Sequence, residues 1–201
     1  MNRPGQIVVL NGAPRSGKSS IAAAIQERLP GVWMNIGVDV AQRMTPGSAQ
    51  PGIGLRPGEA AHPVARLVPT LYAGLYESVA AHSRLGLNVV VDVGHYDVET
   101  VVDAARRLTG LPVLFVGVHC PIDVIMVRRR ASEAGQYVFA DADEPIPAPV
   151  LRWQVEVHAH WSYDLDVDTA ELTPEQCADL IGRQLAEGAS TASRFFAAVD
   201  H

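Results

Sequence analysis

Short, uniformly aliphatic runs alternate along the chain with longer segments whose apolar positions recur at helical spacing. Uniformly apolar runs of this length are typical of strands in a parallel sheet that is covered on both faces. The runs that predict strands are residues 7–10, 32–38, 88–92, 113–118 and 165–167, of which 32–38 is the weakest. The segments that predict helices are 18–29, 70–85, 98–108, 122–131 and 173–186. The fold class is therefore α/β.

Several of these helices carry start signals. Pro69 suits a first helical turn, Asp97 can cap the helix over 98–108, and residues 173–176 have the Thr-Pro-Glu-Gln form of a capping box. No internal repeat or interdomain linker is evident, and 201 residues is a usual length for one α/β domain. We expect a single domain over 1–187 and a C-terminal tail over 188–201, in which Phe195 and Phe196 could dock.

Two segments interrupt the alternation. Residues 45–69 carry five prolines and several glycines, which excludes a helix or a central strand over that stretch. Residues 140–149 combine three acidic residues with three prolines. Connections this long are uncommon unless they serve a site, so both segments are predicted to cover a pocket.

The composition excludes a disordered chain, because 48% of the residues are hydrophobic and 19% are charged. The net charge is −6 and the only basic run is 128–130, so we expect neither nucleic acid nor a membrane surface as a partner. No signal peptide and no apolar run near the length of a membrane helix is evident. Cys120 and Cys177 form no CxxC pair, and we expect reduced thiols in a cytoplasmic protein. Nothing indicates an oligomeric state.

The first predicted strand leads through a glycine-punctuated turn into a helix. The turn matches G-x-x-x-x-G-K-[ST] in full, with Gly12, Ala13, Pro14, Arg15, Ser16, Gly17, Lys18 and Ser19, followed by Ser20. In this context backbone N–H groups and the helix dipole bind a triphosphate. Lys18 would then reach the β- and γ-phosphates, and the Ser19 hydroxyl would bind Mg²⁺. The pattern predicts an ATP and Mg²⁺ site, the alternative being a tight turn without a ligand.

Two aspartates stand at the ends of predicted strands. Asp92 ends the strand over 88–92, where an aspartate beside a phosphate loop typically holds Mg²⁺ through water; alternatively it caps the turn at Gly94. Asp39 follows the second strand, at the sheet edge where open α/β sheets bind ligands. Phosphoryl transfer to an alcohol needs a base near the hydroxyl proton, and Asp39 is the candidate. From the pattern alone, Asp39 could equally cap a short helix over 40–44.

The transferred phosphoryl group also needs cations that stabilise its developing charge. Arg128, Arg129 and Arg130 end the predicted helix over 122–131, and at least one of them is expected to meet ATP. A solvated helix end that offsets the dipole is the alternative. The histidines show no metal-ligand spacing with cysteine or aspartate, so no zinc site is expected. His158 and His160 alternate in a segment expected to be helical and so would not share a face.

The order of these pieces is itself informative. Leu-Asn-Gly at 10–12 enters the phosphate loop, Gly-Val-Asp stands at 37–39, and Arg128 follows Cys120 by eight positions. Tyr-Asp and Val-Asp-Thr precede the last predicted helix, at 163–164 and 167–169. From residue 6 to about residue 185 the chain thereby resembles the chloramphenicol phosphotransferase-like family of P-loop kinases. The phosphate loop is common to many families, whereas the other pieces are more particular.

The resemblance implies a three-layer P-loop kinase fold, with five parallel strands, helices on both faces and a small arginine-bearing lid. It implies ATP as donor and a small-molecule hydroxyl as acceptor, as in the inactivation of chloramphenicol, and hence a role in antibiotic resistance. The family's base maps onto Asp39, its phosphate-loop lysine onto Lys18 and its first lid arginine onto Arg128. Asp168 and Thr169 lie where such kinases pass near the adenine.

The predicted lid, about 128–149, departs from the family pattern. The family repeats arginines as Arg-x-x-Arg-Gly-Asp-Arg, whereas residues 131–136 contain none, and Arg129 or Arg130 could substitute. The acceptor therefore stays open between chloramphenicol, a sugar or nucleoside-like metabolite, and the substrate of a toxin-like kinase. A non-catalytic ATP-binding regulator is the alternative from another class. A GTPase switch is not expected, because the chain lacks an Asn-Lys-x-Asp motif.

Overall fold

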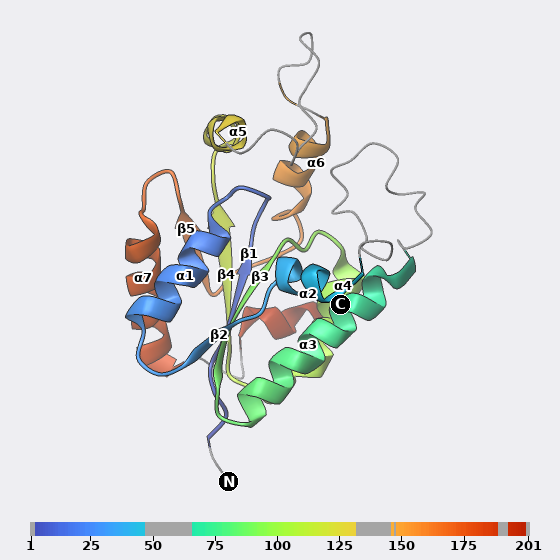
Figure 1. Ribbon diagram of the computed structural model, residues 1–201, viewed down its shortest axis with the longest axis vertical. Helices are drawn as coiled ribbons and strands as arrows, with labels where there is room; N and C mark the ends of the chain where they lie inside the picture. The colour runs from blue at the N-terminus through green and yellow to red at the C-terminus, as the bar shows by residue number, and fades with distance from the viewer. Residues whose placement is uncertain (1–2, 47–65, 132–145, 147, 189–192, 200–201) are drawn as a thin grey trace.

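A sheet of five parallel strands, in the order β2–β3–β1–β4–β5, forms the centre of the computed structural model (Figure 1). Its strands are β1 (Ile7–Asn11), β2 (Trp33–Asn35), β3 (Asn88–Val93), β4 (Val113–His119) and β5 (Leu165–Asp168). The structure describes residues 3–46, 66–131, 146, 148–188 and 193–199. Most of the two predicted covers, 45–69 and 140–149, therefore lies outside the described residues.

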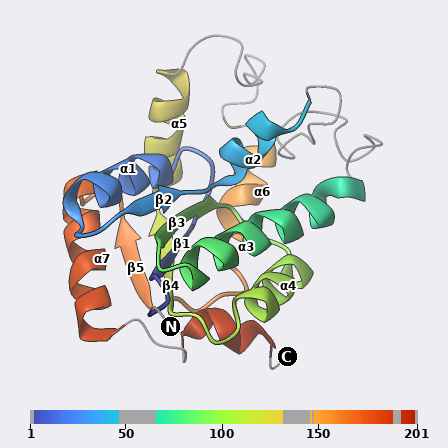
Figure 2. The ribbon, with the colours of Figure 1, turned by 60° about the horizontal axis from the view of Figure 1, so that its bottom comes forward.

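Helices cover both faces of this sheet (Figures 1 and 2). The helices α1 (Lys18–Arg28) and α7 (Pro174–Gly188) pack on one face, and α3 (Val68–Arg84) and α4 (Val98–Leu108) cover the other. Three more stand near the carboxyl edge of the strands: α2 (Val38–Met44), α5 (Ile122–Arg130) and α6 (Ala148–Glu156). This arrangement confirms the predicted three-layer α/β fold.

Burial on both faces explains why the strand sequences are apolar throughout. In β1, Val8 and Leu10 face α1 and α7, whereas Ile7 and Val9 face α3 and α4, and all four side chains are fully buried. A strand that is covered on one face only would alternate apolar and polar residues. Because the strand interiors are apolar, the side chains that could bind or react lie at the strand ends and in the loops that follow them.

The sequence predicted most helices and strands where the structure has them, with three differences. The Asp97 carboxylate caps α4 by accepting from Thr100 N at 2.9 Å, and Thr173 and Gln176 exchange both bonds of the capping box. The prediction of a strand over 32–38 was wrong at its end, because β2 stops at residue 35 and Val38 begins α2. Helix α6 was not predicted, and residues 157–160 form a turn after it rather than helix.

The C-terminal segment η4 (Arg194–Val199) packs against α4 and β4. The Phe195 side chain is fully buried, with its ring centroid 5.1 Å from that of Phe115 and 6.3 Å from that of Tyr76. The Asp164 carboxylate accepts from the backbone N–H of Phe115 and of Arg194, at 2.8 Å each. One carboxylate thereby links β4 to the C-terminal segment, so residues near the end of the chain complete the core.

Replacing Phe195 by alanine is expected to lower the free energy of unfolding by about 3–5 kcal/mol, the usual cost of emptying a buried phenylalanine site. Urea unfolding followed by circular dichroism measures the change. Phe196→Ala is the matched control, because that ring is only partly buried and its loss is expected to cost less than half as much. Equal losses in the two variants would contradict the docking of Phe195.

Candidate active site

The phosphate-binding loop runs from Gly12 to Ser19 and joins β1 to α1. Gly17 has φ 100°, a left-handed conformation that favours glycine, and it precedes the first residue of α1. No side chain caps this end of α1, so its first N–H groups are left to an anion. The Ser16 hydroxyl is buried and has no hydrogen-bond partner among the described residues. These donors fit the triphosphate that the sequence predicts.

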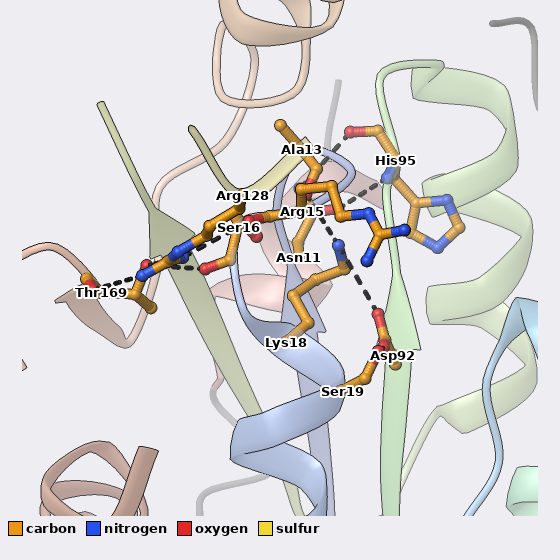
Figure 3. A network of polar contacts seen from close by, with 10 residues as sticks. All are labelled: Asn11, Ala13, Arg15, Ser16, Lys18, Ser19, Asp92, His95, Arg128 and Thr169. Carbon is orange, nitrogen blue, oxygen red and sulfur yellow. Dashed lines mark hydrogen bonds and ion pairs between the residues drawn. The ribbon is translucent and has the colours of Figure 1, made fainter. Parts of the chain in front are cut away.

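Lys18, Ser19 and Asp92 meet at the start of α1 (Figure 3). The Ser19 hydroxyl donates to Asp92 Oδ2 at 2.5 Å, and the Lys18 ammonium lies 3.6 Å from Asp92 Oδ1. The ammonium also donates to the Ala13 carbonyl at 2.9 Å, inside the loop. Asp92 reaches this position because β3 pairs with β1 so that Asp92 stands beside Leu10, just before the loop.

Burial and two carboxylates have opposite effects on the charge of Lys18. Burial lowers the pKa of the Lys18 ammonium below its ordinary value, and the carboxylates of Asp92 and Asp39 oppose this shift. Only 10% of the side chain is exposed. Because the nearby carboxylates do not fully offset desolvation, the site favours the arrival of further negative charge.

Asp39 is the second residue of α2 and is exposed at the same edge of the sheet. The preceding Gly37 lets the start of α2 approach β3 closely, since a side-chain carbon there would come within 2.9 Å of the Asp92 carbonyl oxygen. The charge of Asp39 acts on Lys18 in the direction that raises its pKa. The structure therefore brings the candidate base to the same side of the loop as Lys18.

Arg128 lies on the other side of the loop and contacts protein atoms there (Figure 3). Its guanidinium donates to Thr169 Oγ1 at 3.0 Å, to the Thr169 carbonyl at 2.8 Å and, more weakly, to the Arg15 carbonyl at 3.4 Å. The Thr169 hydroxyl donates to the Ser16 carbonyl at 2.7 Å. Asp168 accepts from Ala170 N at 2.8 Å and so shapes the turn after β5. Arg128 thus holds this turn against the phosphate loop.

The remaining predicted residues take ordinary positions around the loop. Pro14 lies beside Ala13 and is half-buried, and Ser20 is exposed in the first turn of α1. Of the two arginines that could substitute in the lid, Arg129 is buried and Arg130 is exposed. Among the described residues, no group of three or more metal-binding side chains comes together. The oxygens of Ser19 and Asp92 are donors of the kind that Mg²⁺ prefers.

Sequence patterns missed a buried polar group beneath the loop. His95 follows β3 and is 2% exposed; its ring lies 5.0 Å from that of Tyr72, and its Nε2 lies 2.6 Å from the Tyr76 hydroxyl. Burial lowers the pKa of His95 to about 4, so the ring is neutral at physiological pH. Asn11, the last residue of β1, hydrogen-bonds to the backbone of His95. The only sequence signal for Asn11 was its place before Gly12.

No helix in the described part of the chain is long and apolar enough to cross a membrane.

Comparison with known proteins places the chain among phosphotransferases. A family model described as chloramphenicol phosphotransferase-like protein matches residues 5–186. A Mycobacterium tuberculosis protein named "Putative O-phosphotransferase", known from two strains, is 31% identical over 179 residues, which cover 82% of this chain and 75% of the relative.

Solved structures share the fold at lower identity. The tunicamycin resistance protein of Deinococcus radiodurans is 21% identical, with a TM-score of 0.61 over 92% of this chain and 97% of that one. The APS kinase CysC of Mycobacterium tuberculosis, solved with AMPPNP and APS, is 16% identical, with a TM-score of 0.62 over 92% and 99%. These likenesses confirm the P-loop kinase fold.

Proposed function

The chain belongs to the chloramphenicol phosphotransferase-like protein family, and on that premise we propose that it transfers the γ-phosphoryl group of ATP to a hydroxyl group of a small molecule. The observation that carries the proposal is the meeting of Lys18, Ser19 and Asp92 at the start of α1. Phosphoryl transfer is catalysed mainly by positioning and by stabilising charge, and this group supplies the means for both.

The nucleotide would occupy the loop with its phosphates on the backbone N–H groups of residues 12–20. Lys18 would leave the Ala13 carbonyl for the β- and γ-phosphates, which replace a neutral acceptor by a charged one. Ser19 and Asp92 would hold Mg²⁺, whose charge neutralises the transferring group when it is bound. The 2.5 Å hydrogen bond between these two side chains keeps the two oxygens that would bind Mg²⁺ close together.

Asp39 would orient the acceptor hydroxyl and accept its proton. Its side chain is exposed, and its charge acts on Lys18 in the direction that raises the pKa of that lysine. Asp39 is thus suited to hold the hydroxyl in line while the phosphoryl group transfers.

Arg128, Asp168 and Thr169 would act on the nucleotide side. The hydrogen bonds of Arg128 to Thr169 place its guanidinium behind Gly17, where it stiffens the loop and adds positive charge near the phosphates. The turn at Asp168 and Thr169 would pass along the adenosine portion. We therefore assign Arg128 a positioning role, through its bonds to Thr169, in addition to the charge stabilisation that the family resemblance implies.

The site supports the reaction class, whereas the acceptor class has to be found by experiment. Members of the family and proteins with the same fold carry names that cover antibiotics, sugars and other metabolites, so chloramphenicol is one acceptor among several to be tested. Phosphorylation of such a compound would support a role in antibiotic resistance.

Incubating the purified chain with ATP, Mg²⁺ and a panel of aminodiols, chloramphenicol, sugars and nucleosides is expected to add one PO₃H unit to at least one compound. Mass spectrometry identifies the product, and a coupled assay measures acceptor-dependent ADP release. Chelating Mg²⁺ with EDTA is expected to abolish the reaction, and added Mg²⁺ to restore it. Tight ATP binding without turnover on any acceptor would instead support a non-catalytic regulator.

A further inference from the structure

We propose that Asn11 is a positioning residue that couples helix α6 and the segment after β3 to the phosphate-binding loop. Asn11 is fully buried at the carboxyl end of β1 and directly precedes Gly12. Its Oδ1 accepts from the backbone N–H of His95 at 2.6 Å (Figure 3). Its Nδ2 donates to the Val157 carbonyl and to the Tyr163 hydroxyl, at 3.0 Å each. Two segments distant from β1 in sequence, the one after β3 and the one after α6, therefore meet on one amide.

The carboxamide is suited to this position because every contact needs a particular atom. An N–H group faces Oδ1, and a carbonyl and a hydroxyl face the two hydrogens of Nδ2. Turning the amide over would place oxygen against the Val157 carbonyl and hydrogen against the His95 N–H. Neither an apolar residue nor an aspartate can make the same set of bonds, so the fixed amide defines how the two segments lie relative to β1.

Helix α6 packs against the phosphate loop, since Trp153 shares a buried cluster with Ala13. Val157 follows α6, the helix that carries Trp153, whose ring lies 5.0 Å from that of Tyr96 in the segment after β3. Gln154, also on α6, donates to the Cys120 carbonyl at 2.9 Å. Through its bond to the Val157 carbonyl, Asn11 therefore fixes the end of α6 to the end of β1.

The network continues beyond Tyr163 toward the nucleotide side. His158 Nδ1 lies 2.7 Å from the Tyr163 hydroxyl, and its ring stacks on that of His119 at 4.1 Å. The His119 carbonyl accepts from Thr169 N at 3.0 Å, and Thr169 in turn bonds to the phosphate loop. Asn11 is thus linked through Tyr163 to the Thr169 turn on one side of the loop, and directly to His95 on the other.

The coupling has a catalytic consequence that rests on the proposed function. Loosening Asn11 is expected to shift α6 and the segment after β3 relative to the loop, while the loop N–H groups that would bind the nucleotide keep their place at the start of α1. Misplacement by about 1 Å can lower a transfer rate by about 10²-fold. Asn11→Ala is therefore expected to lower the acceptor-dependent kcat by about 10²-fold, while the Kd for Mg·AMPPNP changes by less than about threefold.

Hydrogen exchange tests the coupling itself on the ligand-free full chain. Asn11→Ala is expected to speed amide exchange in α6 and in residues 94–97 by about tenfold, with β4 unchanged. Tyr163→Phe removes one partner of Asn11 without opening a cavity and is expected to act in the same direction to a smaller extent. The matched control is Asn88→Ala, which removes the bond from Gln6 N to Asn88 Oδ1 at the opposite end of the sheet and leaves exchange in α6 unchanged.

Unchanged exchange of α6 in both Asn11→Ala and Tyr163→Phe would overturn the coupling. The same holds if Asn88→Ala speeds α6 exchange equally, because the effect would then be general destabilisation. Failure of the wild-type chain to bind Mg·AMPPNP would overturn the proposed function, and the exchange comparison would still decide the role of Asn11.

Discussion

Replacing Lys18 by methionine is expected to lower kcat by about 10³-fold or more and to weaken Mg·AMPPNP binding, while the chain stays folded. Removing one preorganised donor to a developing anionic charge costs about 10²–10³-fold, and phosphoryl transfer depends on such cations more strongly still. Methionine has nearly the same length, so the packing around the loop is kept. Steady-state kinetics with the acceptor found by mass spectrometry measure the loss.

The same variant is expected to be at least as stable as the wild type without ligand. Burial lowers the pKa of Lys18, which means that the folded state disfavours the ammonium despite Asp92 and Asp39. A lysine with a lowered folded-state pKa costs stability at low pH and ceases to do so as the pH rises from the folded-state pKa toward the ordinary one. An unchanged or higher Tm at neutral pH together with lost activity would identify Lys18 as a functional group retained at a structural cost.

Lys18 can be observed directly, because it is the only lysine among the 201 residues. Chain labelled with ¹³C at the lysine ε-carbon should give one lysine signal, and its pH titration reports one pKa. Without ligand this pKa is expected below the ordinary lysine value, and with Mg·AMPPNP it is expected to rise, because phosphate oxygens favour the charged form. A pKa that the nucleotide leaves unchanged would contradict the contact between Lys18 and the phosphates.

Arg28→Met is the control for loss of a positive charge on the same helix. Arg28 forms an exposed ion pair with Asp179 at 2.8 Å, far along α1 from the loop. Exposed pairs contribute about 0.2–1 kcal/mol, so a small loss of stability and full turnover are expected. A comparable loss of kcat in Arg28→Met would show that net charge, rather than the position of Lys18, limits the reaction.

The strands and the phosphate loop could be predicted from the sequence because the chemistry behind them is local. Val8 and Val9 are neighbours on opposite faces and are both fully buried. An uninterrupted aliphatic run therefore indicates a sheet that is covered on both faces. The loop pattern from Gly12 to Ser19 is likewise contiguous. Asp92 was placed by its position at the end of such a run, and β3 brings it to Ser19 as expected.

Other features could not be predicted, because they depend on contacts between distant residues or on context. Asn11 finds its partners 84, 146 and 152 positions away. Helix α6 was not predicted because three prolines stand at or just before its start and prolines usually exclude a helix. Pro149, however, lies in the first turn, where its missing N–H costs nothing. The sequence named both Arg128 and Thr169 as candidates, but it gave no sign of their contact, which joins residues 41 positions apart.

Asp39→Asn is expected to lower acceptor-dependent kcat by about 10²–10⁴-fold, the usual contribution of a positioned general base. The amide keeps the size of the side chain and can still accept a hydrogen bond, but it cannot take up the hydroxyl proton. Because Asp39 is exposed and no side chain caps the start of α2, little structure depends on it. Binding of Mg·AMPPNP is therefore expected to change by less than about threefold, so the loss should fall on kcat with the nucleotide Kd kept.

Asp123→Asn is the matched control for Asp39→Asn, because Asp123 is also the exposed second residue of a helix, α5. Each substitution removes one favourable carboxylate–dipole interaction, of about 0.3–1 kcal/mol, so similar small changes in Tm are expected. The charge of Asp39 acts on Lys18, whereas Asp123 is not among the charges that shift the pKa of Lys18, so only Asp39→Asn is expected to remove the proposed base. Full turnover in Asp39→Asn would require another group to accept the proton, whereas equal losses in both variants would trace the effect to the helix ends rather than to the acceptor hydroxyl.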